Sequence, residues 1–173
     1  GNVVFYGGWY NFFAHFLFEH FNVDNCYSLD LNMETVESSK KLYQHEHSKG
    51  KFHSYHANVS KIAWKNNMMN FNDLAPIEEK DKFKQSDKFD FNDIPINLVV
   101  NTSCEHMDNS WYENLPEGKV IVLQTNDYFS NPQHMNCCED VAAAKVKYPM
   151  SKVFYEGTLD THLYNRFMLI GQK

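Results

Sequence analysis

Short apolar runs alternate with amphipathic stretches along this chain of 173 residues. The first run, Val3–Tyr6, stops at Gly7-Gly8 and is typical of a buried strand that enters a tight turn. Large apolar residues then recur at intervals of three and four, which predicts one face of a helix. That face would carry Trp9, Phe12, Phe13, Phe16, Leu17 and His20.

The next segments repeat the alternation of strand and helix. Residues 26–31 predict a second strand that ends on an acid, and Asn32 is placed to cap a helix that runs to about Tyr43 or His47. Residues 52–59 predict a third strand whose polar character is typical of a sheet edge. Further strands are predicted at 96–100, 119–124, 153–159 and 167–170, and a helix at 140–147.

This order of elements predicts an α/β fold, a Rossmann-like three-layer sandwich. The sheet would be mostly parallel, with an antiparallel C-terminal hairpin formed by the last two strands. In such sheets ligands bind at the carboxyl ends of the strands, beside the point where the strand order reverses. The site is therefore expected after the first four strands.

The length of the chain fits a single domain over residues 1–173. Residues 61–95 interrupt the pattern, because they are polar and charged and are longer than an ordinary connection. Their apolar residues, such as Trp64, Met68 and Met69, are scattered. We interpret the segment as an insertion, with a lid as its candidate role.

The net charge and the cysteines narrow the possible classes of function and the expected cellular location. A formal net charge of -6 argues against a general nucleic-acid-binding protein, since such proteins present basic surfaces to phosphates. No apolar run approaches the roughly 18 residues of a membrane span. Cys104 lies at the end of an apolar strand, where a reduced, buried thiol is expected. The four cysteines form no C-x-x-C pair, so a reducing, cytoplasmic location is expected. They are Cys26, Cys104, Cys137 and Cys138.

Two features after predicted strands together indicate a ribose-containing ligand. Gly7-Gly8 follow the first strand, and Asp30 stands 22 residues after Gly8, close to the roughly 20-residue spacing at which an acid binds ribose hydroxyls. Each feature alone is equally well explained by an ordinary turn or by a helix-capping acid. The bulky Trp9 and Tyr10 in the turn disfavour the pyrophosphate of a dinucleotide.

From Val3 to about Val122, the order and spacing of these elements resemble the class I S-adenosyl-L-methionine (SAM)-dependent methyltransferases. The resemblance implies SAM as the cofactor and methyl transfer as the activity. In that family the glycine loop faces the methionine part, the acid binds the ribose and a residue after the third strand meets the adenine. The resemblance thus implies a cofactor site of Tyr6, Gly7, Gly8, Trp9, Asp30, Leu31, Asn58, Val59, Asn101 and Ser103.

The family's fourth strand often ends in a Ser-x-x-Glu-His-apolar run, and residues 101–107 match it with Ser103 one residue closer to the pair. The chain departs from the family in its divergent glycine loop, which lacks the third glycine, and in having no acid at the end of the first strand. The resemblance implies that His106 serves as a general base and Glu105 as its orienting partner. The alternative is that Glu105 and His106 only stabilise the loop, because neighbours in sequence point in different directions. Weaker candidates are Tyr10, Tyr128 and His134.

The remaining histidines do not predict a metal site. His45-x-His47 and His53-x-x-His56 lack the spacing of zinc ligands, and the adjacent Cys137-Cys138 is not a C-x-x-C pair. We expect the histidine pairs to lie on the solvated surface.

Two other classes of function stay open alongside the methyltransferase. One is a different enzyme on the same scaffold, either nicotinamide-dependent or cleaving the sulfonium of SAM. The other is a non-catalytic interaction module that keeps the fold. The small-molecule cofactor is the one partner that the pattern indicates, and the acceptor and the oligomeric state are left unassigned.

Overall fold

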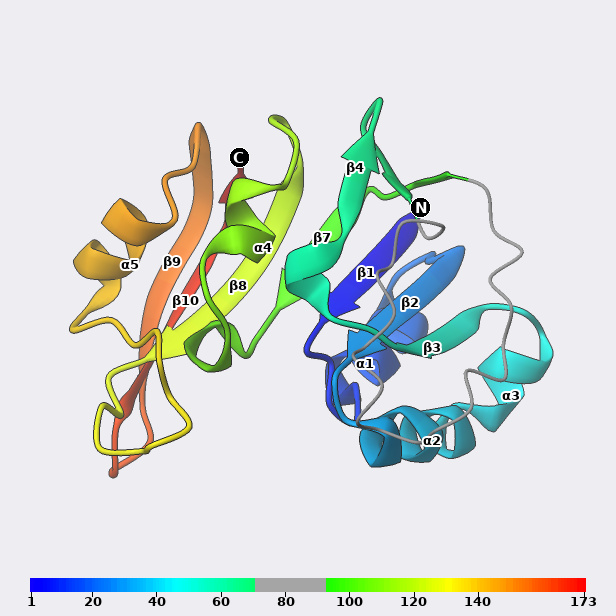
Figure 1. The fold of residues 1–173 in the computed structure, drawn as a ribbon, viewed down its shortest axis with the longest axis horizontal. Helices are drawn as coiled ribbons and strands as arrows, with labels where there is room; N and C mark the ends of the chain where they lie inside the picture. Colours follow the sequence, from blue (N-terminus) through cyan, green and yellow to red (C-terminus); the bar gives the residue numbers. More distant parts are fainter. Residues whose placement is uncertain (71–92) are drawn as a thin grey trace.

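The computed structural model describes residues 1–70 and 93–173 (Figure 1), and its centre is a seven-stranded sheet. The strands are β1 (Asn2–Tyr6), β2 (Asn25–Asp30), β3 (Phe52–His56), β7 (Leu98–Asn101), β8 (Val120–Asn126), β9 (Lys152–Asp160) and β10 (Asn165–Gln172). Their order across the sheet is β3-β2-β1-β7-β8-β10-β9.

The sheet is parallel except at β10, which runs antiparallel to both of its neighbours, β8 and β9. This confirms the predicted Rossmann-like α/β fold with an antiparallel C-terminal hairpin. The chain builds outward in one direction from β1 to β3 and in the other from β7 to β9, so the strand order reverses between β1 and β7. That reversal defines the crevice in which open α/β sheets bind ligands.

The strand register brings the loops after β1, β2 and β7 to one edge of the sheet. Tyr6 pairs with Leu29, so Gly7 lies beside Asp30, and Phe5 pairs with Val100 on the other side. Residues separated by about 20 and 95 positions in the chain therefore become neighbours.

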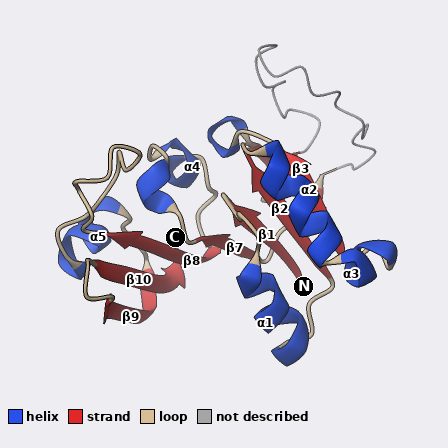
Figure 2. Ribbon diagram, turned by 90° about the horizontal axis from the view of Figure 1, so that it is seen from below, coloured by secondary structure: helices blue, strands red, loops and turns tan. Residues whose placement is uncertain are grey.

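Helices cover both faces of the sheet, and Figure 2 shows α1 on one side and α4 and α5 on the other. A hydrophobic core cluster lies on each face of the sheet, and β1 contributes to both because its side chains alternate between the faces. Val3 and Phe5 belong to one cluster, and Val4 and Tyr6 belong to the other. The helices are α1 (Phe12–His20), α2 (Met33–Leu42), α3 (Gln44–Ser48), α4 (Ser110–Glu113) and α5 (Val141–Lys147).

The prediction for the first helix was wrong at its start and right for only part of its buried face, where Leu17 is buried and Phe13 is partly buried. The helix begins at Phe12 rather than at Trp9, and its buried residues are Ala14 and Leu17. Phe12 is 67% exposed and Phe16 is 47% exposed. Because Ala14 packs with Val3 and Phe5 in one core cluster, its small side chain lets the helix lie close to β1, and Phe12 and Phe16 are turned toward solvent.

The other helix boundaries follow from their caps. Asn32 accepts hydrogen bonds from the Glu34 and Thr35 N–H groups, as predicted, and α2 ends at Leu42 before the short α3. Asp140 caps α5 in the same way through the Ala143 N–H.

The segment at 61–95 contains more structure than the sequence predicted. Three short antiparallel strands form a second, small sheet. They are β4 (Ala63–Lys65), β5 (Met68–Asn70) and β6 (Ile94–Pro95). Met69 is fully buried in the core next to Tyr6, so this sheet packs on the domain. The candidate lid role falls mainly on residues 71–92, which lie outside the described residues.

No helix within the described part of the chain combines the length and the apolar character that a membrane crossing requires.

Candidate functional site

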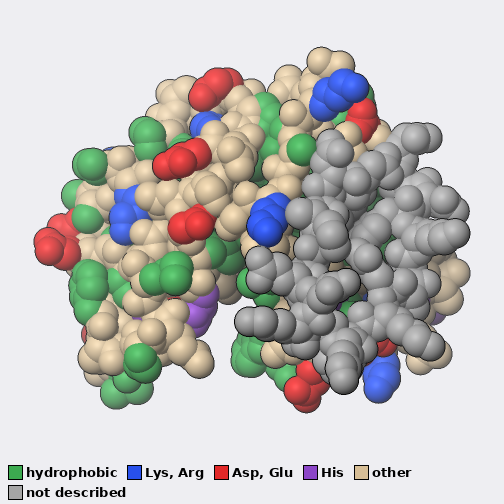
Figure 3. Space-filling view, viewed as in Figure 1, with side chains coloured by type: hydrophobic (Ala, Val, Ile, Leu, Met, Phe, Trp, Pro, Cys, Tyr) green, Lys and Arg blue, Asp and Glu red, His purple; other side chains and the backbone are tan. Residues whose placement is uncertain are grey.

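A cavity of about 1010 Å³ lies at the carboxyl ends of the strands, on both sides of the β1–β7 reversal. Figure 3 shows the molecule hollowed between its two halves, with a histidine side chain on one wall. On the coloured part of this face, acidic and basic side chains are interspersed. The volume is at the upper end of the range for small-molecule sites, which leaves room for two ligands side by side.

The glycine loop forms one wall, and its backbone is left-handed at alternate residues. Gly7 has φ +61°, and Trp9 and Asn11 have φ +48° and +57°. Sequence reasoning found no third glycine here, and the structure shows non-glycine residues in the left-handed region instead. The Asn11 side chain supports the turn by donating from Nδ2 to the Trp9 carbonyl at 3.1 Å and to Ser28 Oγ at 2.8 Å.

Asp30 connects this loop to the end of β2. One carboxylate oxygen accepts from the Trp9 N–H at 2.9 Å, and the other accepts from the Asn32 N–H at 2.8 Å. A carboxylate offers about four lone-pair positions, so Asp30 keeps acceptor capacity toward the cavity that it lines.

The residues predicted after β3 complete this half of the cavity. Asn58 and Val59 both line it, together with Leu31 at the end of β2. Asn58 Oδ1 accepts from the Ser60 N–H at 3.0 Å, which holds the turn after β3 in place. Gly7, Gly8, Trp9, Asp30, Leu31, Asn58, Val59 and Ser103 are therefore brought together around one space.

Two of the predicted cofactor residues, Tyr6 and Asn101, do not line the cavity. The Tyr6 side chain is buried on the face of β1 opposite to that of Phe5, which lines the cavity, and its ring lies edge-on to Trp111. Burial raises the pKa of the Tyr6 hydroxyl. Asn101 is fully buried and accepts the Ser103 N–H at 3.0 Å. The side chain of Tyr6 is excluded because alternate residues of a strand point to opposite faces.

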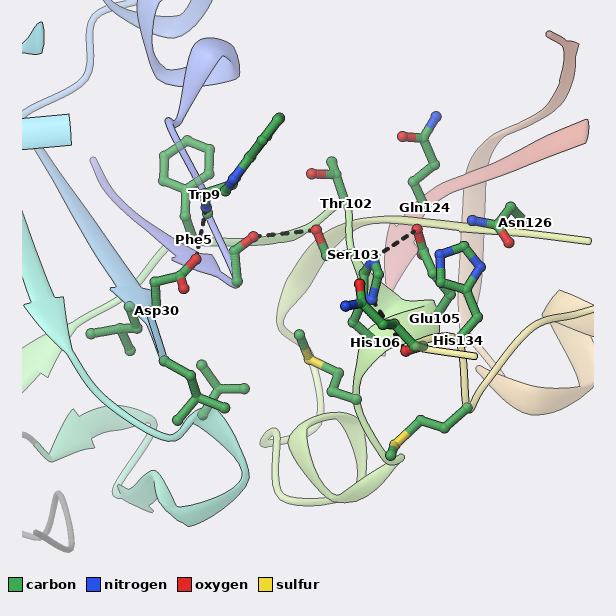
Figure 4. A pocket seen from close by; sticks show the side chains of 18 of the residues that line it. Phe5, Trp9, Asp30, Thr102, Ser103, Glu105, His106, Gln124, Asn126 and His134 are labelled. Carbon is green, nitrogen blue, oxygen red and sulfur yellow. Dashed lines mark hydrogen bonds and ion pairs between the residues drawn. The ribbon is translucent and has the colours of Figure 1, made fainter. Parts of the chain in front are cut away.

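The second half of the cavity lies at the ends of β7, β8 and β10. Ser103 joins the two halves, because its hydroxyl donates to the Gly7 carbonyl at 3.3 Å. Glu105 and His106 both face this half, from a short 3-10 helix at Cys104–His106. Figure 4 shows Asp30 and Trp9 on one side of the pocket and Glu105, His106 and His134 gathered on the other.

Glu105 is only 4% exposed, and its contacts with charged groups are long. Its Oε1 lies 3.9 Å from His106 Nε2 and 3.9 Å from a terminal nitrogen of Arg166, while Oε2 has no hydrogen-bond partner. Arg166 donates to the Thr102 carbonyl at 3.0 Å, and its Nε is likewise buried without a partner.

Several residues of this half were weak candidates or were missed from the sequence. Tyr128 and His134, two of the weaker candidates, line it on the loop after β8. Arg166 was missed, although it is the one arginine of the chain and that rarity is a usable signal. The other missed residues include Thr102, Gln124, Asn126, Asn131, Gln133 and Tyr164.

Of the two histidine pairs that were expected on the solvated surface, His45/His47 is exposed and His53/His56 is partly buried. His45 and His47 are exposed on α3, and His47 Nδ1 contacts the Phe52 carbonyl. His53 stacks on Tyr27 at 4.9 Å, and His56 contacts the Leu31 carbonyl.

All four cysteines are free and buried, which agrees with the expectation of a reduced, buried thiol at Cys104. Burial raises the pKa of the Cys26 thiol to about 12 and raises the pKa of the other three thiols as well. These cysteines therefore belong to the packing of the domain rather than to a nucleophilic site.

Neither a protein-family model nor a curated protein sequence matches this chain. Solved structures do match its fold. Geranyl diphosphate methyltransferase in complex with SAM aligns with a TM-score of 0.64 and 8% identity, over 99% of this chain and 77% of the other. The N-methyltransferase NodS from Bradyrhizobium japonicum WM9 aligns with a TM-score of 0.62 and 8% identity, over 100% and 85%.

A third match, the PH0226 protein from Pyrococcus horikoshii OT3, has a TM-score of 0.60 and 10% identity over 100% of this chain and 82% of the other. The chain spans a smaller share, 37 to 40%, of some larger proteins in the comparison. The strand order and these alignments show that the chain has the fold of the class I SAM-dependent methyltransferases.

Proposed function

We propose that this chain, on its class I methyltransferase fold, binds SAM at the ends of β1, β2 and β3 and transfers the methyl group to an acceptor held at the ends of β7, β8 and β10. The observation that carries the proposal is the Asp30 carboxylate. It is tied to the glycine loop by the Trp9 N–H at 2.9 Å and lines a cavity at the β1–β7 reversal.

The chemistry of this half suits a nucleoside without phosphate. Asp30 has lone pairs available for the two hydroxyls of a ribose, and Gly7 and Gly8 let the backbone approach a ligand closely. Leu31, Asn58 and Val59 provide a partly apolar place for a flat base. When bound, SAM supplies a methyl group on a positively charged sulfur.

The acceptor is assigned to the second half because polar side chains converge there. Glu105 and His106 face this space together with the amide side chains of Gln124 and Asn126. Positioning an acceptor in line with the methyl group is the main requirement of such a transfer. We assign Glu105 and His106 to contact with the acceptor.

The test is calorimetric titration of the chain with SAM and with S-adenosylhomocysteine. Asp30→Ala should weaken the binding of both by about 1–3 kcal/mol, roughly 5- to 150-fold, because the ribose hydroxyls lose their acceptor. Glu37→Ala, which removes an exposed carboxylate on α2, is the matched control and should leave the affinity unchanged.

Each outcome separates the classes of function. An Asp30→Ala variant with wild-type SAM affinity would refute the proposed pocket. Binding of NADH in place of SAM would identify a nicotinamide-dependent enzyme. If SAM binds and the chain converts it to products without any acceptor, the sulfonium-cleaving alternative replaces methyl transfer. If the folded chain binds none of these ligands, the interaction module becomes the better description.

A further inference from the structure

Glu105 is a buried carboxylate in the acceptor half of the cavity, and one of its oxygens has no hydrogen-bond partner. Its side chain is buried, its Oε2 has no hydrogen-bond partner, and its nearest cationic groups stand 3.9 Å away. Buried carboxylates are ordinarily hydrogen-bonded, closely paired or bound to a metal ion. Glu105 meets the first two conditions incompletely, because its two ion pairs are both 3.9 Å long and its Oε2 accepts no hydrogen bond.

Two histidines beside Glu105 have one ring nitrogen held by a backbone carbonyl. His106 Nδ1 lies 3.3 Å from the Gln133 carbonyl, and His134 Nδ1 lies 3.1 Å from the Tyr128 carbonyl. A carbonyl only accepts, so each Nδ1 carries a proton, and in the neutral form of each ring Nε2 then carries the lone pair. Metal-binding histidines are commonly oriented in this way by a hydrogen bond at the other nitrogen.

The three side chains converge, with one ligand atom from each lying within 4.8 Å of the others. Figure 4 shows Glu105, His106 and His134 grouped on the same wall of the pocket. We infer that Glu105, His106 and His134 bind a divalent transition-metal ion. Two imidazoles and one carboxylate form a ligand set typical of such ions, and it leaves coordination positions open.

Binding requires a modest contraction of the cluster. A tetrahedral ion with ligand distances of about 2.1 Å separates its ligand atoms by about 3.4 Å. His106 has a side chain 42% exposed and can move toward Glu105. His134 Nε2, which lies 3.1 Å from Asn131 Nδ2, exchanges that contact for the ion.

The ion would face the space assigned to the acceptor, because all three ligands line that cavity. Resting on the proposed function, the site indicates an acceptor that binds the ion through oxygen atoms, such as one hydroxyl or two adjacent oxygens. Contact with a divalent ion lowers the pKa of such a hydroxyl. In this role Glu105 and His106 hold the ion, and His106 is not the general base that the sequence suggested.

The experiment is a calorimetric titration of the untagged, chelator-treated chain with Zn²⁺ and with Mg²⁺. We expect one Zn²⁺ per chain and much weaker binding of Mg²⁺, since Mg²⁺ prefers oxygen ligands. His134→Gln and Glu105→Gln should each weaken Zn²⁺ binding by at least about tenfold. Two variants are used because Glu105 is buried, and circular dichroism verifies that each is folded.

The control is the double variant His45→Gln/His47→Gln, which removes two exposed histidines on α3. It should bind Zn²⁺ as the wild type does. The inference is overturned if the wild type binds no Zn²⁺, or if the folded His134→Gln variant binds it with unchanged affinity.

The same variants separate this inference from the proposed function. His134→Gln should keep SAM affinity within about twofold, because His134 is in the half of the cavity opposite Asp30 and Trp9. A chain that binds SAM but no Zn²⁺ disproves the metal site alone. A chain that binds Zn²⁺ at these residues but no SAM supports the metal site and disproves the cofactor pocket.

Discussion

At the scale of single residues, Gly8 leaves no room for a side chain in the loop after β1. A Cβ there would lie 2.2 Å from Asn11 Oδ1 and 2.7 Å from Ser28 Oγ, in two buried side chains that hydrogen-bond to each other. We expect Gly8→Ala to lower the free energy of unfolding by about 1–3 kcal/mol, as other overpacking substitutions do. Urea denaturation measures this loss, and the SAM affinity should fall with it because Gly8 lines the cavity.

Gly50 is the comparison, because it has φ +68° and no atom within 4 Å of its added Cβ. Gly50→Ala should cost about 1–2 kcal/mol of backbone strain and leave the SAM affinity unchanged. A Gly8→Ala variant as stable as the wild type and equal to it in SAM binding would contradict the close packing of this loop.

At the scale of elements, α2 begins next to the proposed cofactor site and depends on its cap. Asn32 Oδ1 accepts from the Glu34 N–H at 2.9 Å and from the Thr35 N–H at 3.4 Å. Asn32→Ala should lower the free energy of unfolding by about 0.5–2 kcal/mol, as measured by thermal or urea denaturation. Its SAM affinity should change far less than that of Asp30→Ala, because the backbone N–H of residue 32 still donates to Asp30. Equal losses of SAM affinity in the two variants would argue that Asp30 does not contact SAM and affects its binding only by positioning the start of α2.

At the scale of the whole molecule, the cavity joins the two halves of the sheet, with the β1–β3 half on one side and the β7–β10 half on the other. A ligand that binds only the folded chain adds about 2.7 kcal/mol at 100 times its Kd. For a chain of this size, each kcal/mol raises Tm by about 2–4 °C. We therefore expect SAM at that concentration to raise Tm by about 5–10 °C in differential scanning calorimetry. NADH at the same concentration should not, and an equal shift with NADH would contradict a SAM-selective pocket.

The predictable part of the fold rests on local patterns. The apolar run of β1, the acid at the end of β2 and the cap at Asn32 are all readable in short windows, and they led to the right sheet. The first helix was mispredicted at its start and in part of its buried face. Apolar spacing does not tell which stripe meets the sheet, and the left-handed Trp9 and Asn11 interrupt the helix geometry.

The sequence by itself determined the order along the chain of the seven strands of the main sheet and of α1, α2 and α5, and the position of Gly7, Gly8 and Asp30 at strand ends. Those properties depend on spacing within about 20 residues, where strand and helix periodicity are decisive. The tertiary structure decided the second half of the cavity. Glu105, His134 and Arg166 come from separate loops and an antiparallel strand, and only sheet pairing and loop packing over long sequence distances bring their side chains to one place.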